Sequence, residues 1–389
     1  MSHFDRLRRE AANAPESGIV AVAQHAFGRK DVIPLWAGEG DLSTPSFISD
    51  AAAKSLTDGE TFYTRQRGLP ELRQALADYT ERLYGMPQSA ERFFVTGSGM
   101  QAIQIAIAAL AGAGDEVIYF GPAWPNFAAA AGLIGAKPVE VALDPRDGGW
   151  RLDLDKLQDA VTAKTRTIFV NTPANPTGWT ASEDELRAIR DIARKAGIAI
   201  IADEIYSRFF YAGARAPSFH DVMEPDDTIF FVNSFSKNWA MTGWRVGWIE
   251  APEELGGVLE NLIQYSTSGV ATFMQRAAHT ALIDGEPFVE EQIARAHRAR
   301  DIFAERLLAT NRVMLDPPDG AFYAFFRIDG VEDTHAAAIR MVEEAHVAMA
   351  PGTAFGPVAP NYLRACFHRR LDEVEMAADR IAEWIGRNG

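Results

Sequence analysis

The sequence predicts an α/β protein with two domains, the larger of which holds a parallel sheet flanked by helices. The first observation is the alternation between about residues 90 and 250, where helical patterns such as 183–195 alternate with short apolar runs. The second is the change after Gly269 to long charged helices, notably 286–308, and then to strands. The third is the length of 389 residues, which exceeds the usual size of one hydrophobic core. We therefore expect a smaller α+β domain in the C-terminal part.

Three short apolar runs in the larger part are rich in β-branched residues and are typical of buried parallel strands. They cover residues 167–170, 198–202 and 228–233. The first runs into a proline- and glycine-rich segment that contains Asn175, the second ends at Asp203, and the third leads to Lys237. Open α/β sheets bind their ligands beside the carboxyl ends of the strands, so we expect these three side chains at one rim.

The run Ser234-Phe235-Ser236-Lys237, with Arg245 eight residues beyond the lysine, indicates the chemistry at this rim. A lysine amine can condense with an aldehyde, and the two hydroxyls and the guanidinium can share the negative charge of a phosphate. Arg245 should also disfavour a protonated neighbouring amine. An isolated string of this kind is usually an exposed lysine in a turn, but this one follows a strand of the predicted sheet. It is equipped to hold a phosphorylated aldehyde.

A second anion site is predicted at residues 96–101, Thr-Gly-Ser-Gly-Met-Gln, before an Ala/Ile-rich helical pattern over 102–110. A glycine-rich turn that leads into a helix directs backbone N–H groups at an anion. Glycines before a helix are more often only a tight turn, so this feature is weak by itself.

On these residues the chain resembles a pyridoxal-phosphate (PLP) enzyme of fold type I, in the class I/II aminotransferase family of the aspartate aminotransferase superfamily. The resemblance covers nearly the whole chain. Its motifs are Gly38-Glu39-Gly40-Asp41, Tyr63-Thr64 with Gly68 and Leu72-Arg73, Asn175-Pro176-Thr177-Gly178, Asp203-Glu204-Ile205-Tyr206, Ser234-Phe235-Ser236-Lys237 and Tyr362-Leu363-Arg364. It implies pyridoxal 5'-phosphate as the cofactor and a large domain with a mostly parallel seven-stranded sheet flanked by helices.

The resemblance also implies the domain limits. Residues 1–14 would form an N-terminal arm, 45–274 the large PLP-binding domain, and 15–44 together with 275–389 a discontinuous small domain. Gly38 and Arg364 would then approach the cofactor together as the domains close.

The catalytic residues that the resemblance implies are Lys237, Asp203 and Tyr206. Lys237 would form the internal aldimine and later move a proton between the substrate α-carbon and the cofactor C4′. Asp203 would pair with the pyridine nitrogen and keep it protonated, although an Asp at a strand end could simply cap a helix. Asn175 and Tyr206 would hydrogen-bond the ring's phenolic oxygen. Trp124 would stack on the ring, with burial in the core as its alternative.

The phosphate would be held by Ser98 and by the amides of Gly99 and Met100, together with the serines and the arginine of the lysine motif. Tyr63 and Thr272 match positions that reach the phosphate from the neighbouring subunit. The resemblance therefore implies a homodimer with shared active sites.

Substrate binding is expected to divide between two ends. Arg364 would clamp the amino acid's α-carboxylate as a bidentate pair, helped by the Asn175 amide and the Gly38 backbone. At the other end, Met100 stands where similar bacterial aspartate aminotransferases often place a lysine. Met100 and Phe322 would form an apolar wall, which favours neutral or aromatic substrates slightly over acidic ones. Tyr323, Trp36 and Phe127 are further candidates for this wall.

Two arginines leave open the possibility that the substrate is acidic. Arg65 and Arg67 stand two and four residues after Tyr63, so they could enter the pocket of the other subunit and bind a second carboxylate.

The resemblance implies an enzyme that moves the amino group of an L-amino acid to a 2-oxo acid such as 2-oxoglutarate. The alternative is another PLP enzyme on the same scaffold, a β-eliminating C–S lyase or a cyclopropane-forming synthase. A regulator fused to a DNA-binding domain would need a helix-turn-helix extension, whereas this chain enters the catalytic pattern within its first forty residues. Two X-Pro bonds, Gly121-Pro122 and Asn175-Pro176, are expected to be cis.

Composition excludes several classes of partner. Lys plus Arg number 38 and Asp plus Glu number 53, a net charge of −15, which argues against binding to nucleic acid or anionic membranes. Cys366, the single cysteine, suits a reducing compartment and is best explained as a small buried residue. The first ten residues are charged rather than signal-like, and no apolar stretch is long enough to span a membrane. We expect a cytoplasmic protein without a metal site.

Overall fold

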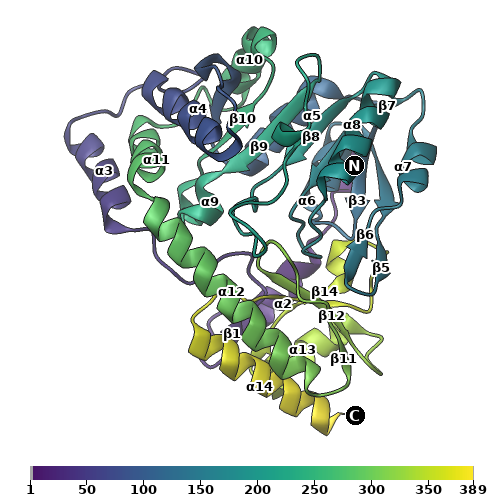
Figure 1. The fold of residues 1–389 in the computed structure, drawn as a ribbon. Coiled ribbons are helices and arrows are strands. Elements are labelled where there is room, and N and C mark those ends of the chain that lie inside the picture. Colours follow the sequence, from purple (N-terminus) through teal and green to yellow (C-terminus); the bar gives the residue numbers. More distant parts are fainter. Residues whose placement is uncertain (1–2, 389) are drawn as a thin grey trace.

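Within residues 3–388, which the computed structural model describes, the larger domain is built on a seven-stranded sheet (Figure 1). The strand order is β2-β10-β9-β8-β7-β3-β4. The strands are β2 (Phe93–Thr96), β3 (Glu116–Gly121), β4 (Lys137–Ala142), β7 (Thr165–Asn171), β8 (Ala199–Asp203), β9 (Ile229–Ser234) and β10 (Gly247–Glu250). All neighbours pair in parallel except that β10 is antiparallel to both β2 and β9. The predicted mostly parallel sheet is confirmed.

Helices cover both faces of this sheet because successive strand residues point to opposite sides. In β8, Ile200 and Ala202 pack in one hydrophobic cluster and Ile201 packs in another. The first cluster includes α7 (Leu154–Ala160) and α8 (Glu183–Ala196), and the second includes α5 (Gly99–Leu110), α6 (Asn126–Leu133) and α10 (Gly256–Ser266). The large domain is therefore a three-layer α/β/α arrangement.

A further helical group covers the edge of the sheet at β2 and β10. Here α11 (Thr272–Asp284) packs on α3 (Ser46–Thr57) and α4 (Pro70–Tyr84). Ala278 and Leu282 of α11 share a hydrophobic cluster with Leu72 of α4. Because α11 buries its apolar face against α3 and α4, we propose that it belongs to the large domain and that the boundary lies after the expected residue 275.

The long helix α12 (Glu286–Leu308) runs from the large domain into the smaller one (Figure 1). Val289, near its start, packs in the cluster of α3, α4 and α11, whereas Ala296 and Phe303 pack in the core of the smaller domain. We propose that the small domain begins within α12.

In the described residues, the small domain contains a four-stranded antiparallel sheet in the order β11-β12-β15-β14. The strands are β11 (Val313–Met314), β12 (Tyr323–Ile328), β14 (Ala350–Pro351) and β15 (Leu363–Cys366), and β1 (Ile33–Pro34) pairs in parallel with β13 (Val347–Ala348). The helices are α2 (Gly18–Ala26), α13 (Thr334–Glu344) and α14 (Leu371–Arg387). Val22 and Leu35 share a core with Phe303 and Trp384. We propose that residues 15–44 belong to this domain.

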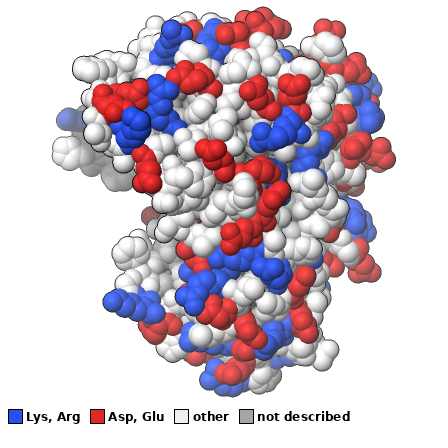
Figure 2. Space-filling view, turned by 60° about the vertical axis from the view of Figure 1, so that its left-hand side comes forward, with Lys and Arg blue, Asp and Glu red and all other residues white. Residues whose placement is uncertain are grey.

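The remaining elements are the N-terminal arm and a small hairpin. In the arm, α1 (Arg9–Ala12) contacts α6, and the first two residues of the expected arm 1–14 lie outside the described residues. The hairpin pairs β5 (Asp144–Arg146) with β6 (Gly149–Arg151). On the face shown in Figure 2, acidic and basic side chains are interspersed over both domains. None of the helices within 3–388 is both long and apolar enough to cross a membrane.

Candidate active site

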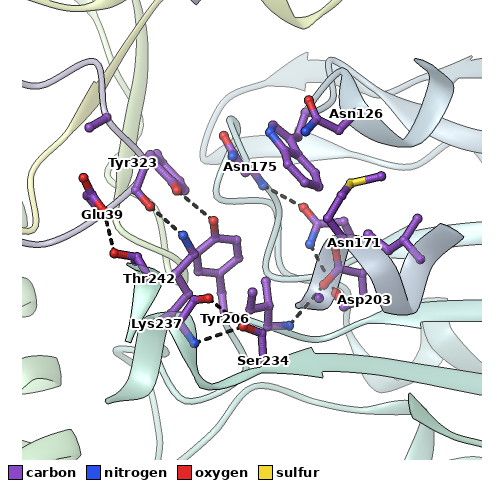
Figure 3. Close-up of a pocket in the computed structure, with 18 of the residues that line it drawn as sticks. Glu39, Asn126, Asn171, Asn175, Asp203, Tyr206, Ser234, Lys237, Thr242 and Tyr323 are labelled. Carbon is purple, nitrogen blue, oxygen red and sulfur yellow. Dashed lines mark hydrogen bonds between the residues drawn. The ribbon is translucent and has the colours of Figure 1, made fainter. Parts of the chain in front are cut away.

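A cavity of about 550 Å³ lies at the carboxyl ends of β7, β8 and β9, where residues of the small domain meet the sheet. Most of the predicted site residues line it, namely Gly38, Gly99, Met100, Trp124, Asn175, Asp203, Tyr206, Ser234, Ser236, Lys237, Arg245 and Arg364. Figure 3 labels five of these side chains, which come from separate elements: Asn175, Asp203, Tyr206, Ser234 and Lys237. The prediction that three strand ends meet at one rim is confirmed.

Lys237 lies in α9 (Phe235–Asn238), a short helix that begins directly after β9. Its Nζ donates a hydrogen bond of 2.7 Å to the carbonyl of Gly38 (Figure 3). Burial lowers the pKa of Lys237 to about 8, and the charges of Arg364 and Arg245 act in the same direction, whereas Glu39 opposes them. A larger fraction of this amine is neutral near pH 7 than for an exposed lysine, which suits a nucleophile.

Asp203 is the last residue of β8 and is buried. Burial raises the pKa of its carboxyl to about 7, while a hydrogen bond from the Ile205 N–H opposes that shift. A cation placed beside Asp203 would restore its ionised form. A protonated pyridine nitrogen is such a cation, so this carboxyl fits the predicted cofactor.

Asn171, which the sequence did not single out, supports this region. Its side chain donates to the backbone carbonyl of Asp203 at 3.2 Å and accepts from the Asn175 N–H at 2.9 Å. The register of β7 and β8 could have indicated Asn171, because Asn171 and Asp203 are paired positions at the ends of these adjacent parallel strands.

The start of α5 provides donors for an anion. Ser98 caps this helix by accepting a hydrogen bond of 2.9 Å from the Gln101 N–H, and it does not itself line the cavity. Gly99 and Met100 are the first two helical residues and line the cavity. N–H groups in the first turn of a helix lack acceptors within the helix, so both can face a phosphate.

Two serines and an arginine stand opposite these amides. The Ser234 hydroxyl accepts from the Ser236 N–H at 2.9 Å and lies 2.7 Å from the Ser236 hydroxyl. Arg245 donates to the Thr242 carbonyl and lines the same cavity. Hydroxyls, a guanidinium and free amides at one place are the donors that a phosphate needs.

The Arg364 guanidinium is buried on β15 and held at several points. It donates to Asn175 Oδ1 at 3.2 Å and to the carbonyl of Trp36, and it lies 4.7 Å from the centre of the Tyr323 ring. Its Nε has no hydrogen-bond partner among the described residues. A buried guanidinium with unused donor capacity is suited to a carboxylate.

Phe322, which was expected to form part of the substrate wall, does not line this cavity. Only 1% of its surface is exposed, and its ring packs against the rings of Phe209 and His368 in the core. The next residue, Tyr323, lines the cavity. Phe127 also lies in the core, where its ring stacks on the ring of Phe169 with 3.9 Å between the ring centres.

Tyr63 and Thr272 lie away from this cavity and line a shallow surface depression together with Arg65. Tyr63 is 95% exposed. Arg67 is held in its own chain by Glu91 at 2.8 Å and by Glu260 at 3.0 Å. These ion pairs compete with a substrate carboxylate for Arg67, which favours Arg65 of the two candidates.

Other groups at the cavity were not predicted as site residues. Glu39 accepts a hydrogen bond of 2.6 Å from the Thr242 hydroxyl at the cavity wall, and Asn126 and Ile103 also line it. The Gly121-Pro122 and Asn175-Pro176 bonds are cis as expected, and the described residues contain a third cis bond at Thr172-Pro173.

Comparisons with known proteins agree with this geometry. The profile of the family described as aminotransferase class I and II matches residues 30–381. An aspartate aminotransferase of Pyrococcus horikoshii is 35% identical, covering 94% of this chain and 93% of that protein. The aromatic-amino-acid aminotransferase 2 of Thermococcus litoralis is 34% identical, covering 98% and 97%. The solved alanine aminotransferase from Pyrococcus furiosus superposes with a TM-score of 0.91 at 28% identity, covering 98% of this chain and 100% of that one.

Proposed function

Because the chain belongs to the class I and II aminotransferase family, we propose that the cavity described above is its active site. The protein is a PLP-dependent aminotransferase, which moves the amino group of an amino acid to a 2-oxo acid. Its relatives are named aminotransferases, so these comparisons do not favour the alternatives, the β-eliminating lyase and the cyclopropane-forming synthase. When bound, the coenzyme supplies an electron-withdrawing ring that accepts the negative charge developing at the substrate α-carbon.

The observation that carries the proposal is the buried amine of Lys237, whose pKa burial lowers to about 8, at the same rim as Asp203 and Arg364. We assign the coenzyme aldehyde to Lys237 Nζ, which also moves the proton at the substrate α-carbon. Asp203 would pair with the ring nitrogen and keep it protonated. The guanidinium of Arg364, with Asn175 beside it, holds the substrate carboxylate.

Further residues complete this assignment. Tyr206 and Asn175 would donate to the phenolic oxygen of the coenzyme, and Trp124 would cover its ring. The amides of Gly99 and Met100, with Ser236 and Arg245, would hold the phosphate. These assignments predict transfer of the amino group to an added 2-oxo acid. Release of pyruvate and ammonia without an acceptor would instead identify a lyase.

We propose that the substrate is a neutral or aromatic L-amino acid rather than an acidic one. Met100 and Ile103 line the cavity together with Trp36. The cationic side chains of the described residues that line it, Lys237, Arg245 and Arg364, are all assigned to other groups. A second carboxylate would therefore lack a partner within this chain.

Turnover of phenylalanine, alanine, methionine and aspartate with 2-oxoglutarate tests this preference. Phenylalanine or alanine should give the highest kcat/KM, and Met100→Lys should shift the preference toward aspartate. A clear preference of the unmodified enzyme for aspartate would contradict the proposal. If Arg65→Ala then removed that preference, Arg65 of a second subunit would be the missing cation.

We propose that the enzyme is a homodimer with shared active sites. Tyr63 and the adjacent Phe62 are 95% and 85% exposed, and Thr272 lies in the same depression, which is what residues serving another subunit require. Mixing a Lys237→Ala subunit with a Tyr63→Ala subunit tests this assignment. One site of the mixed dimer is complete only if Tyr63 acts across the interface, so activity should return on mixing. No recovery in a verified mixed dimer would contradict the assignment.

We also propose a cytoplasmic location. It is supported by the single cysteine, Cys366, which is buried and unpaired as expected in a reducing compartment.

A further inference from the structure

Tyr323 reaches the cavity from the small domain and meets Tyr206 of the large domain. It is the first residue of β12 and is fully buried. Its hydroxyl oxygen lies 2.7 Å from that of Tyr206, and the two rings are edge to face at 85° (Figure 3). The pair is thus a hydrogen bond between the two domains inside the site.

The direction of this hydrogen bond follows from the proposed function. A tyrosine hydroxyl has one proton to donate, and Tyr206 uses it on the phenolic oxygen of the coenzyme. Within the pair, Tyr206 must then accept and Tyr323 must donate. Burial raises the pKa of Tyr206, and the hydrogen bond from Tyr323 acts against that rise. A more acidic phenol is the stronger donor, so Tyr323 strengthens the contact that Tyr206 makes.

The ring of Tyr323 makes a second contact, with the arginine that we assign to the substrate carboxylate. The Arg364 guanidinium lies over it at 4.7 Å, a distance at which a cation is attracted by an aromatic face. Arg364 is also held by Asn175 and by the carbonyl of Trp36. One side chain therefore touches both the donor to the coenzyme and the guanidinium that binds the substrate carboxylate.

The lack of a side chain at Gly38, which lies next to Lys237 in space, leaves room for this arrangement. A Cβ at Gly38 would lie 2.8 Å from the Tyr323 hydroxyl oxygen, closer than real Cβ contacts come. The carbonyl of the same glycine accepts the hydrogen bond from Lys237. The absence of a side chain at residue 38 is what allows Tyr323 and Lys237 to occupy one corner of the cavity.

We propose that Tyr323 is a positioning residue for amino transfer: its hydroxyl directs the Tyr206 proton to the coenzyme, and its ring holds the Arg364 guanidinium. This inference rests on the proposed function, because it assigns the acceptor of the Tyr206 proton.

Tyr323→Phe tests the hydroxyl and keeps the ring. The readout is the pH titration of the visible absorbance of the lysine-bound coenzyme. A weaker donor at Tyr206 stabilises the basic form of the chromophore less, so its pKa should rise by roughly half to one unit, as expected for the loss of one neutral hydrogen bond. Because the ring stays under Arg364, KM for the amino acid should change less than kcat. In Tyr323→Leu, which loses the ring as well, KM should also rise.

Tyr211→Phe is the matched control. Tyr211 donates to the carbonyl of Ala321, two residues before Tyr323, and does not line the cavity. Its titration should equal that of the unmodified enzyme. An unchanged titration in Tyr323→Phe, or an equal shift in Tyr211→Phe, would overturn the inference. If the unmodified enzyme itself gave no coenzyme band that titrates, the proposed function would fail first, so the two failures are distinguishable.

Discussion

Gly38→Ala should destabilise the protein through a single contact. The new Cβ would lie 2.8 Å from the Tyr323 hydroxyl oxygen, whereas ordinary contact begins at 3.4 Å. The difference, 3.4 minus 2.8, requires a shift of 0.6 Å in a buried side chain that Tyr206 and Arg364 hold in place. Gly38 is not among the glycines with a positive φ, so the backbone adds no strain of its own.

The size of the effect can be bounded. Overpacking of a buried contact costs about 1–3 kcal/mol. Removing the hydroxyl in Gly38→Ala/Tyr323→Phe leaves Tyr323 Cζ and Cε1 as the nearest atoms, at 3.7 and 3.9 Å, which is ordinary contact. The double variant should therefore recover most of the loss, with a coupling between the two positions of about 1 kcal/mol or more.

The assay compares urea-unfolding midpoints of the unmodified protein, the two single variants and the double variant, all without coenzyme. Circular dichroism reports the fold of each. Gly112→Ala is the control, because a Cβ there would meet nothing within 4 Å among the described residues and the φ of Gly112 is not positive. If the losses of the two single variants simply added in the double variant, the clash with the hydroxyl would not be the cause.

The remaining predictions concern the lysine, the aspartate and the carboxylate clamp. Lys237→Ala should keep its circular dichroism but lose covalent trapping of the coenzyme by borohydride; labelling that persisted would place the attachment elsewhere. Addition of the coenzyme to cofactor-free enzyme should accelerate as pH rises and level off above about 8, because burial lowers the pKa of Lys237 from 10.5 and the neutral amine is the nucleophile; a rate still rising at pH 10 would contradict this. Asp203→Asn should weaken coenzyme binding in an absorbance titration by roughly 10- to 150-fold, the value of a hydrogen bond to a charged group; unchanged affinity would remove Asp203 from the ring nitrogen. Arg364→Lys keeps the charge but loses the two-pronged geometry, so KM for the amino acid should rise about tenfold or more with a smaller change in coenzyme affinity; an unchanged KM would argue that another group binds the carboxylate.

Elements whose ends carry local signals were predictable from the sequence. The pattern over 183–195 corresponds to α8, which begins after a capping box at Ser182 and ends at Gly197 in the left-handed region. The pattern over 286–308 corresponds to α12, which has a proline in its first turn. In α8 both boundary signals, and in α12 the start signal, lie within a few residues of the periodic pattern, so no tertiary information was needed there.

The rim of the site was predictable for a different reason. Strands β7, β8 and β9 are parallel, so residues that follow them meet at one edge whatever the connecting loops do. Asp203 and Lys237 reach the cavity in this way.

The expectations that differ from the structure depend on packing between distant segments of the chain. Phe322 and Tyr323 are both aromatic, and only the placement of the small domain on the large one decides which of them faces the cavity. Arg67 is excluded by carboxylates 24 and 193 positions away in the chain. The start that we propose for the small domain differs from the expected residue 275 because α11 finds its partners in α3 and α4, more than 180 residues earlier.

The pairing of β1 with β13 determines how much of the chain must be synthesised before the active site can form. Ile33 is opposite Val347, and this short ladder holds the segment that carries Gly38. A ribosome must therefore synthesise the chain as far as β13 before the segment with the lysine's backbone acceptor can be held in place. Contacts so remote in sequence form slowly. Nascent chains should consequently stay colourless in the presence of vitamin B6 until β13 has left the ribosome.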